Sequence, residues 1–397
     1  MIEVLARDTS WTPPSTADYL AFHASHRPEA TAVLENGVEY SYARFHRDLR
    51  KVTHALAAFG LERGSLVAVA CGSVYIHWLL LLGWENLGIA TASFIKGESS
   101  TTLLALLARA DLVMSEADLP AGSKARHHRL TQTWVDAVLA SPPPPVNQST
   151  GQGVSLAEVL RIRRSSGTTG GQKMMAVKRR EEEACLQQIQ QIYGFNQHTR
   201  ILLVKGFGVA AMYGAATVCV RMGAVSIYET RFDTARAIVE HRANHARLYQ
   251  FEMLPLLDRF VTDLNKPTEF TAIMGAAPLG DALRARVLSL LASALIYSYS
   301  ANEVWVISDV DSTGVGTVYP GVQVAVVDES DAPVPAGKSG RVRVRSPAMV
   351  EGYLDNPEAT ARSFRDGWFY TGDAGIMVGP RRLKIVNAGT KGASVAE

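Results

Sequence analysis

The chain has 397 residues, of which 47% are hydrophobic and 20% are charged, and its net charge is +2. This length exceeds a typical single core and predicts two or three subdomains, while the small net charge argues against nucleic acid or an anionic membrane as a partner. Cys71, Cys185 and Cys219 lie far apart without a CxxC spacing, which argues against a disulfide framework or a zinc site and favours a reducing, cytoplasmic location. Residues 1–15 contain acids and prolines and lack the apolar stretch of a signal peptide.

The most apolar stretch covers residues 74–95, but His77, Glu85 and Asn86 interrupt it, so we expect a buried helix followed by a strand and no membrane span. Elsewhere, short apolar runs that end in small or polar residues alternate with amphipathic stretches. The runs cover residues 65–72, 200–206, 224–229, 246–252, 271–277 and 294–300, and the amphipathic stretches cover 232–245 and 279–293. This alternation predicts an α/β fold in which helices cover layered, mostly parallel β-sheets.

The pattern changes after about Gly321. Residues 321–330 and 340–347 alternate apolar and polar positions with turn residues between them. This pattern predicts a smaller antiparallel β-subdomain near the C-terminus, with one solvated face. Three arginines, Arg341, Arg343 and Arg345, belong to that face, and we interpret them as a solvated strand surface in preference to a phosphate-binding stripe.

The predicted organisation follows from these patterns. A body over residues 1–320 precedes the β-rich subdomain over residues 321–386 and a tail over residues 387–397. Within the body, the Pro- and Ser-rich segment 141–153 is predicted to be an exposed connection.

The run RRSSGTTGGQK, residues 163–173, cannot build a core, because it has no large apolar side chain and its glycines cost backbone entropy on folding. Its backbone N–H groups, hydroxyls and lysine ammonium can converge on phosphate oxygens. A flexible linker is the alternative, although a linker needs neither adjacent threonines nor a lysine. The P-loop of nucleoside triphosphatases does not match, because Met174 follows Lys173 where that motif has Ser or Thr.

Four segments in this order resemble the adenylate-forming enzymes, a superfamily of acyl- and aryl-CoA ligases, luciferases and adenylation domains of peptide synthetases. SSGTTGGQK resembles the phosphate loop of that family, and MGAAPLG at residues 274–280 is similar to its Gly-Gly-Ala-Pro-Leu turn. YSANE at residues 299–303 resembles its Tyr-Gly-x-Thr-Glu motif. The segment GYLDNPEATARSFRDGWFYTGDAG at residues 352–375 is the most similar, and residues 40–69 also resemble the family.

Three of these matches also have a physical reason of their own. Tyr299 can stack on an adenine, Glu303 can hold Mg²⁺ near phosphates, and Asp373 can accept two ribose hydroxyls. The alternatives are a capped strand-to-helix turn at residues 299–303 and an ordinary turn acid at Asp373. Asn356 and Pro357 are interpreted as an N-cap and a first helical residue, and therefore as structural.

The resemblance implies a set of site residues. The implied catalytic residues are Thr168, Thr169, Lys173 and Glu303, with Glu303 as the metal ligand. The implied nucleotide site consists of Ser165, Ser166, Gly167, Thr168, Thr169, Gly170, Lys173, Ala276, Ala277, Tyr299, Ser300, Asn302 and Asp373. The implied substrate site consists of Lys205, Phe207, Gly208, Gly275 and Ser298. Lys205 resembles the lysine of benzoate-type ligases, and an ordinary loop lysine is the alternative. Tyr249, Phe251 and Met253 are expected near the wall of the acyl pocket.

The sequence departs from the family pattern at several places. Met174 ends a Gln-Lys-Met stretch where the family has Pro-Lys-Gly, Ser300 and Asn302 replace Gly and Thr, and Gly208 stands where many acyl-CoA ligases have His. After Val386 the family continues through an Arg-Asp hinge into a mobile lid domain, whereas this sequence ends at Glu397. We therefore expect a body without its lid, either as a natural short form or as part of a longer chain, with incomplete activity by itself.

The function that the resemblance implies is ATP-dependent activation of a carboxylic acid, expected to be a small aromatic or short acyl acid, to an acyl-adenylate. Its cofactors would be ATP and Mg²⁺, with coenzyme A or a carrier-protein thiol as acceptor. The expected partners are a small-molecule carboxylate, a lid domain or carrier protein, and a second copy in a homodimer, without nucleic acid or membrane. The alternative is a degenerate fold that binds a nucleotide or acyl group, or serves as a scaffold, without turnover.

Overall fold

The computed structural model describes residues 13–95, 98, 101–145, 155–165, 173–275 and 279–387. The predictions for Ser166, Gly167, Thr168, Thr169, Gly170, Ala276 and Ala277 lie outside these residues, as does most of the predicted connection at 141–153. The chain divides into two compact units. The first unit contains residues 1–32, 39–162 and 177–183, and the second contains residues 33–38, 163–176 and 184–397. The predicted division at residue 320 falls inside the second unit and stays a prediction.

The first unit is built on a sheet with the strand order β6-β5-β3-β4-β7-β8, in which the pairs from β6 to β7 are parallel. Its strands are β3 (Leu66–Ala70), β4 (Ala90–Ser93), β5 (Leu112–Ser115), β6 (His127–Arg129), β7 (Val159–Arg164) and β8 (Met174–Lys178). Its helices are α2 (Thr16–His26), α3 (Tyr42–Ala57), α4 (Val74–Asn86), α5 (Thr101–Arg109) and α6 (Gln132–Ala140). The last strands, β7 and β8, also carry the chain into the second unit.

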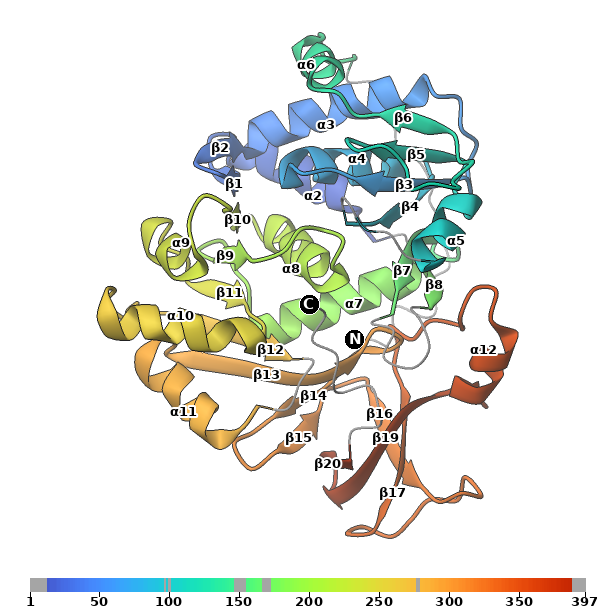
Figure 1. Cartoon of the computed structure of the whole chain (residues 1–397), viewed down its shortest axis with the longest axis vertical. Helices are drawn as coiled ribbons and strands as arrows, with labels where there is room; N and C mark the ends of the chain where they lie inside the picture. Colours follow the sequence, from blue (N-terminus) through green and yellow to red (C-terminus); the bar gives the residue numbers. More distant parts are fainter. Residues whose placement is uncertain are drawn as a thin grey trace. The chain divides into compact units, whose positions relative to one another are not determined.

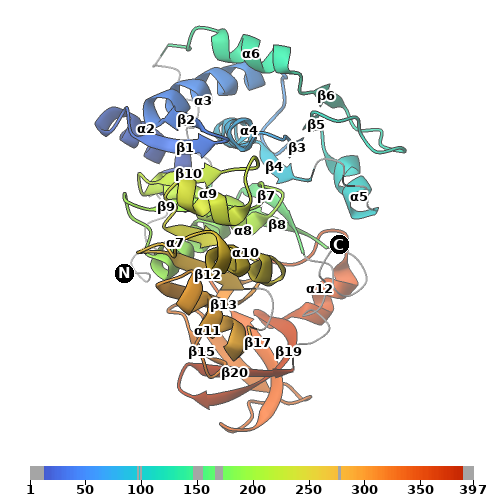
Figure 2. The same ribbon diagram turned by 60° about the vertical axis from the view of Figure 1, so that its left-hand side comes forward.

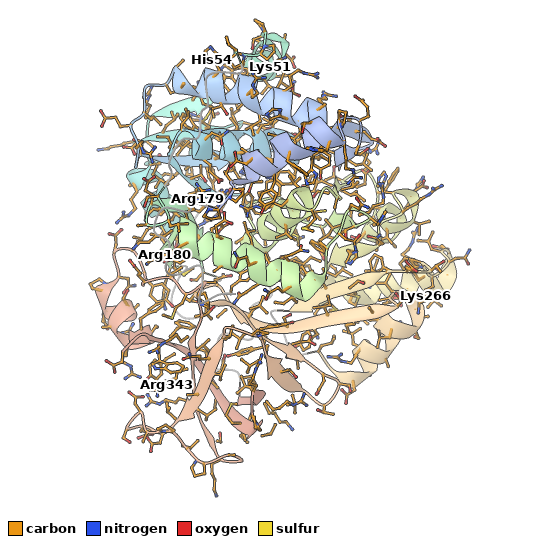
Figure 3. All side chains as sticks on the ribbon, turned by 180° about the vertical axis from the view of Figure 1, so that it is seen from behind. Lys51, His54, Arg179, Arg180, Lys266 and Arg343 are labelled. Atoms are coloured by element: carbon orange, nitrogen blue, oxygen red, sulfur yellow. The ribbon has the colours of Figure 1, made fainter. Side chains whose placement is uncertain are left out.

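The apolar stretch at residues 74–95 forms α4 and β4, as predicted. Trp78 and Trp84 of α4 are fully buried, because this helix is covered on all sides within the first unit. Among the described residues, no helix has both the length and the hydropathy needed to cross a bilayer. On α3, the Lys51 side chain donates to the carbonyl of Leu139 in α6, and Figure 3 shows Lys51 beside that helix.

The second unit is built on a sheet with the strand order β16-β17-β19-β20-β15-β14-β13-β12-β11-β9-β10-β1-β2, with β18 paired to β19 (Figure 1). The strands are β1 (Thr31–Glu35), β2 (Val38–Ser41), β9 (Arg200–Leu203), β10 (Val225–Tyr228), β11 (His245–Arg247), β12 (Thr271–Gly275), β13 (Ala294–Ala301), β14 (Trp305–Val310), β15 (Val315–Val318), β16 (Gln323–Val327), β17 (Ser339–Arg345), β18 (Phe364–Arg365), β19 (Trp368–Gly379) and β20 (Arg382–Asn387). The helices are α7 (Arg179–Tyr193), α8 (Ala210–Arg221), α9 (Thr234–Glu240), α10 (Gln250–Thr262), α11 (Asp281–Leu290) and α12 (Pro357–Ser363). Parts of α7, β1 and β2 belong to the first unit.

The predicted fold class is confirmed, with one correction to its boundary. Pairing is parallel from β1 through β10, β9, β11 and β12 to β13, and antiparallel from β13 onward. The antiparallel part therefore begins at Trp305, earlier than the predicted Gly321, and it continues the parallel sheet. The sequence did not reveal this change from parallel to antiparallel pairing, because β14 begins with the apolar residues 305–307 and so resembles the buried parallel strands before it.

Two predicted elements end early. The stretch 246–252 was predicted to be a strand, but β11 ends at Arg247 and α10 begins at Gln250. Met253 faces the core from α10 together with Leu256 and Leu257, at the spacing of a helix buried on one face. The amphipathic stretch 232–245 forms only the short helix α9, because Arg242 has a positive φ of 49° and cannot continue a right-handed helix. Figure 2 shows α10 and α11 lying together over the parallel strands.

The arginine face of β17 was predicted to be a solvated strand surface, but aromatic side chains cover part of it. Val342 and Val344 are fully buried on the inner face, as the alternation predicted. On the outer face, the guanidinium groups of Arg343 and Arg345 lie 4.7 Å and 4.6 Å from the ring centre of Trp368 on β19. Arg343 is labelled in Figure 3. These cation–π contacts let aliphatic stems and aromatic rings cover the sheet surface.

Candidate active site

The Thr-Gly-Asp sequence at residues 371–373, within the family-like segment 352–375, lies in a bulge of β19. Strand β17 pairs Arg341 with Ala374 and Arg343 with Tyr370, so three residues of β19 lie opposite the single residue Val342. Gly372, in the middle of the three, has a φ of +83°, a conformation that costs a residue with a Cβ atom. The bulge breaks the in-and-out alternation of the strand and turns the next side chain, Asp373, out of the ladder.

Asp373 meets Tyr299 in this structure. The Tyr299 hydroxyl, on β13, donates a hydrogen bond to the Asp373 carboxylate, and the Asp373 backbone N–H donates to Thr371 Oγ1 at 3.1 Å. Burial, together with the Asp373 charge, raises the pKa of Tyr299 well above its usual value, so this phenol stays protonated and can only donate to the carboxylate. The structure thus brings together two residues that the sequence predicts for the adenine and the ribose.

Glu303 contacts a residue that the sequence analysis did not assign. Its side chain is buried, and Tyr353 donates a hydrogen bond from its hydroxyl to Glu303 Oε1 at 2.7 Å. The Lys173 ammonium lies 4.6 Å from the centre of the Tyr353 ring. Tyr353 therefore touches both the predicted metal ligand and the predicted phosphate-binding lysine. No local pattern could have revealed this, because Tyr353 and Glu303 are 50 positions apart.

The ends of the glycine-rich run are joined. The Ser165 N–H donates to the Lys173 carbonyl at 2.8 Å, and the Lys173 N–H donates to Ser165 Oγ at 2.9 Å. Residues 166–172 between them lie outside the described residues, so this pair fixes where the predicted phosphate loop leaves and rejoins the described chain. Asn302 Nδ2 lies 3.4 Å from the carbonyl of Arg164, next to this junction.

The predicted substrate residues are placed around the carboxyl ends of β9, β12 and β13. Lys205 forms an ion pair with Glu252 at 3.2 Å and lies 5.6 Å from the ring centre of Phe251. Phe207 is buried edge-on against Tyr213. Gly208 lies in the turn before α8, closed by the Val209 N–H donating to the Gly206 carbonyl at 3.2 Å.

Gly275 and Ser298 are direct neighbours across the parallel pair of β12 and β13. A Cβ atom on Gly275 would lie 3.1 Å from the Ser298 carbonyl oxygen, a tight contact that a larger residue could make only if the two strands shifted slightly apart. Ser300, two residues on, lies opposite Val306 beside the bulge at Tyr299. Of the predicted pocket wall, Phe251 is exposed, Tyr249 stacks on it at 5.6 Å, and Met253 lies in the core.

The donor set fits a magnesium ion that arrives with a nucleotide. Among the described residues there is no group of three His, Cys, Asp or Glu side chains that could hold a metal by itself. Glu303 is a single buried carboxylate beside the junction of the predicted phosphate loop. Mg²⁺ in nucleotide sites commonly uses one or two carboxylates, with phosphates and waters as its other ligands, and Glu303 suits that mode.

Comparison with known proteins identifies the family. The model of the AMP-binding enzyme family matches residues 20–354. The chain is 25% identical over 387 residues to 4-chlorobenzoate–CoA ligase of Arthrobacter sp, covering 91% of this chain and 73% of that protein. It is 24% identical over 405 residues to fatty acid–[acyl-carrier-protein] ligase ScoC of Streptomyces coeruleorubidus, covering 90% and 74%. The crystal structure of ATP-bound MatB from Rhodopseudomonas palustris has a TM-score of 0.81 at 21% identity, covering 94% of this chain and 78% of that one.

The chain therefore belongs to the AMP-binding enzyme family. The predicted resemblance to the adenylate-forming enzymes is confirmed, and so is the predicted carboxylate-activating ligase. A scaffold without turnover is not favoured.

Proposed function

We propose that this ligase activates a small aromatic or short acyl carboxylic acid to an acyl-adenylate, using the residues of the second unit described above. The observation that supports this most is the meeting of distant motif residues. Ser165 and Lys173 join the ends of the glycine-rich run, Glu303 and Lys173 share Tyr353, and Tyr299 binds Asp373.

In the proposed reaction, a carboxylate oxygen of the acid attacks the α-phosphorus of ATP. The new P–O bond forms as the bond between the α-phosphorus and the bridging oxygen to the β-phosphorus breaks, and pyrophosphate leaves with that electron pair. The work of the protein is to align the reactants and to offset the charge that builds on the phosphate oxygens. Mg²⁺, when bound, would neutralise part of this charge.

Each described residue has a role in this scheme. Lys173 and Ser165, together with Thr168 and Thr169, hold the β- and γ-phosphates, and Glu303 is the carboxylate that holds the metal. Asp373 accepts the ribose hydroxyls while Tyr299 fixes its orientation and offers its ring to the adenine. Ser300 and Asn302 border the nucleotide.

The size of the acid is argued from the residues near the carboxyl ends of the parallel strands. The Lys205–Glu252 ion pair and the exposed Phe251 ring place charge and an aromatic surface at the end of β9. These groups suit a compact, polar-substituted aromatic acid better than a long alkyl chain. The acceptor is proposed to be the thiol of coenzyme A or of a carrier protein, the acceptors named for the two ligases similar to this chain.

The test is a pyrophosphate-exchange assay with a panel of benzoates, short acyl acids and long fatty acids, followed by mass spectrometry for acyl-AMP and thioester. We expect exchange that depends on Mg²⁺ and on a small acid, and stabilisation of the protein against heat by ATP with Mg²⁺. A lid domain of this family, added as a separate chain, is expected to raise thioester formation, and gel filtration tests the homodimer. Preference for acids of long chain length contradicts the proposed substrate class. Failure of every acid to support exchange, together with failure of ATP to stabilise the protein, contradicts the function.

A further inference from the structure

Tyr353 links the two charged groups that the proposed reaction uses on the phosphates. Its hydroxyl donates to Glu303 Oε1 at 2.7 Å, and its ring lies 4.6 Å from the Lys173 ammonium. One side chain thus contacts an anion through its edge and a cation through its face. A phenol ring has the matching electrostatics, with a donor at the hydroxyl and a negative potential over the face.

The backbone around Tyr353 is held to the same two regions. The Val350 N–H donates to the Glu303 carbonyl at 2.9 Å, and the Leu354 N–H donates to the Met174 carbonyl at 2.8 Å. The segment 350–354 therefore connects the turn between β13 and β14, which contains Glu303, with Met174, the residue that follows Lys173. Both bonds are backbone-to-backbone, so they set the position of Tyr353 independently of its own side chain.

The ring itself has little freedom. The Tyr353 N–H donates to Thr360 Oγ1 at 2.9 Å, and its ring packs edge-on against Phe364 at 5.4 Å. Gly352 allows this packing, because a Cβ atom there would lie 2.6 Å from Thr360 Cγ2. The phenol is therefore presented to Glu303 from a rigid support and loses little side-chain entropy when it makes the bond.

The contacts of Tyr353 leave both charges intact. A phenol with an ordinary pKa of about 10 is a neutral hydrogen-bond donor at physiological pH. A neutral donor satisfies one carboxylate oxygen without cancelling its charge, and an aromatic face attracts an ammonium without neutralising it. An arginine or lysine in this place would form a closed ion pair and remove the charge from use.

We propose that Tyr353 is a positioning residue for nucleotide binding: it orients the Glu303 carboxylate toward the metal that accompanies ATP and holds the Lys173 ammonium beside it. This inference rests on the proposed function. It assigns the hydroxyl and the ring of Tyr353 to different partners, so the two contacts can be removed one at a time.

The experiment uses the full 397-residue chain and measures binding without turnover. Stabilisation by ATP against heat is followed as Mg²⁺ is titrated, and again in EDTA. Tyr353→Phe removes only the hydroxyl, and Tyr353→Leu removes the ring as well. Tyr75→Phe is the matched control, because Tyr75 is also a buried phenol that donates to a buried carboxylate, Asp48 at 3.0 Å, but in the first unit.

We expect Tyr353→Phe to raise the Mg²⁺ concentration for half-maximal stabilisation by roughly tenfold, the effect of losing one hydrogen bond to a charged group. Binding of ATP in EDTA should be unchanged in Tyr353→Phe and weakened in Tyr353→Leu, because only the second variant loses the Lys173 contact. Tyr75→Phe should lower the melting temperature and leave the Mg²⁺ titration as in the wild type.

A double-mutant cycle with Glu303→Gln separates positioning from a general structural effect. If Tyr353 acts through Glu303, adding Tyr353→Phe to Glu303→Gln should change the Mg²⁺ titration little further. Fully additive effects, or a Tyr353→Phe titration that matches the wild type, overturn the inference while the proposed function stands. A wild-type chain that binds no ATP with or without Mg²⁺ overturns both.

Discussion

Two groups of buried charged residues, one in each unit, are built in opposite ways. In the first unit, the Arg161 guanidinium lies 3.3 Å from Glu85 and 3.7 Å from Glu182, and it donates to Thr91 Oγ1 at 2.9 Å. All three charged side chains are buried. In the second unit, the buried Glu303 forms no ion pair among the described residues and is bound by the neutral Tyr353 hydroxyl.

The difference separates a structural cluster from a candidate site. In the first unit, each of the two carboxylates lies beside the same guanidinium, so every charged group of this cluster has an opposite charge next to it inside the protein. A buried carboxylate that meets only a neutral donor has no opposite charge beside it, and burying it as an anion is costly unless a ligand supplies one. Burial of a charged residue therefore does not indicate a functional site by itself. The distinguishing feature is whether its partner in the protein is an opposite charge or a neutral donor.

The largest expected effect comes from breaking the closed cluster. Arg161→Met removes the guanidinium that lies beside Glu85 and Glu182, and removing one partner of a buried charge pair costs about 3–5 kcal/mol in the free energy of unfolding. Urea denaturation measures it, and Arg161→Lys, which keeps the charge but not the guanidinium geometry, serves as the control. A change below about 1 kcal/mol would show that the cluster is not the closed ion-pair network described here.

Substitution of Glu303 should have the opposite result, with a small effect on stability and a large effect on activity. Glu303→Gln keeps an oxygen that accepts from Tyr353, so we expect the free energy of unfolding to change by less than about 1 kcal/mol. Pyrophosphate exchange should fall roughly a hundredfold or more, because an electrostatic contact to the reacting phosphates is lost. Glu85→Gln is the counterpart in the first unit: it should lower stability and leave the exchange rate of the folded protein unchanged. If Glu303→Gln and Glu85→Gln lowered the exchange rate equally, the distinction between a structural cluster and a candidate active site would be wrong.

A smaller effect is expected at the bulge of the second unit. Gly372→Ala forces a Cβ atom onto a backbone with a φ of +83°, which costs about 1–2 kcal/mol of stability. Because the bulge sets the direction of the Asp373 side chain, Gly372→Ala should also weaken the binding of adenosine nucleotides by more than the loss of stability explains. Calorimetric titration with AMP measures this loss of affinity. Gly337→Ala, at a φ of +83° in a loop with open space around it, is the control for strain without the site.

At neutral pH the smallest effect concerns one buried histidine in each unit, because this effect develops only as the pH falls. Burial lowers the pKa of His77 to about 3, with a further contribution from Arg161, and burial lowers the pKa of His245 to about 4. Both stay neutral in the folded protein, whereas the unfolded chain takes up protons below about pH 6.5. Stability should therefore fall as the pH falls from about 6.5 toward these values, with a slope of at most ~1.4 kcal/mol per pH unit for each group.

Denaturation midpoints between pH 3 and pH 7 test this in the wild type, His77→Gln and His245→Gln. Each substitution should reduce the dependence of stability on pH by the contribution of the histidine that it removes. The comparison between units is sharpened if the first-unit variant changes the slope over the wider range, since the pKa of His77 is the lower of the two. A slope that neither substitution changes would contradict both assignments.

Local patterns in the sequence determined much of this protein. Alternating apolar runs and amphipathic stretches predicted the α/β fold, and Asn356 before Pro357 predicted the start of α12, where the Asn356 side chain accepts from the Ala359 N–H. These features depend on neighbouring residues and on the periods of helix and strand, so they can be read along the chain. The motif residues Tyr299, Glu303 and Asp373 were predicted from the resemblance of short contiguous segments to motifs of the adenylate-forming enzymes.

The tertiary structure alone decided what those residues touch. Tyr353 binds Glu303 across 50 positions, Tyr299 binds Asp373 across 74, and Arg161 binds Glu85 across 76. It also decided that the sheet turns antiparallel at β14 and that Arg343 stacks on Trp368. Such contacts are set by strand order and by bulges, which no local pattern records, because a side chain's partner depends on which strand lies next to its own.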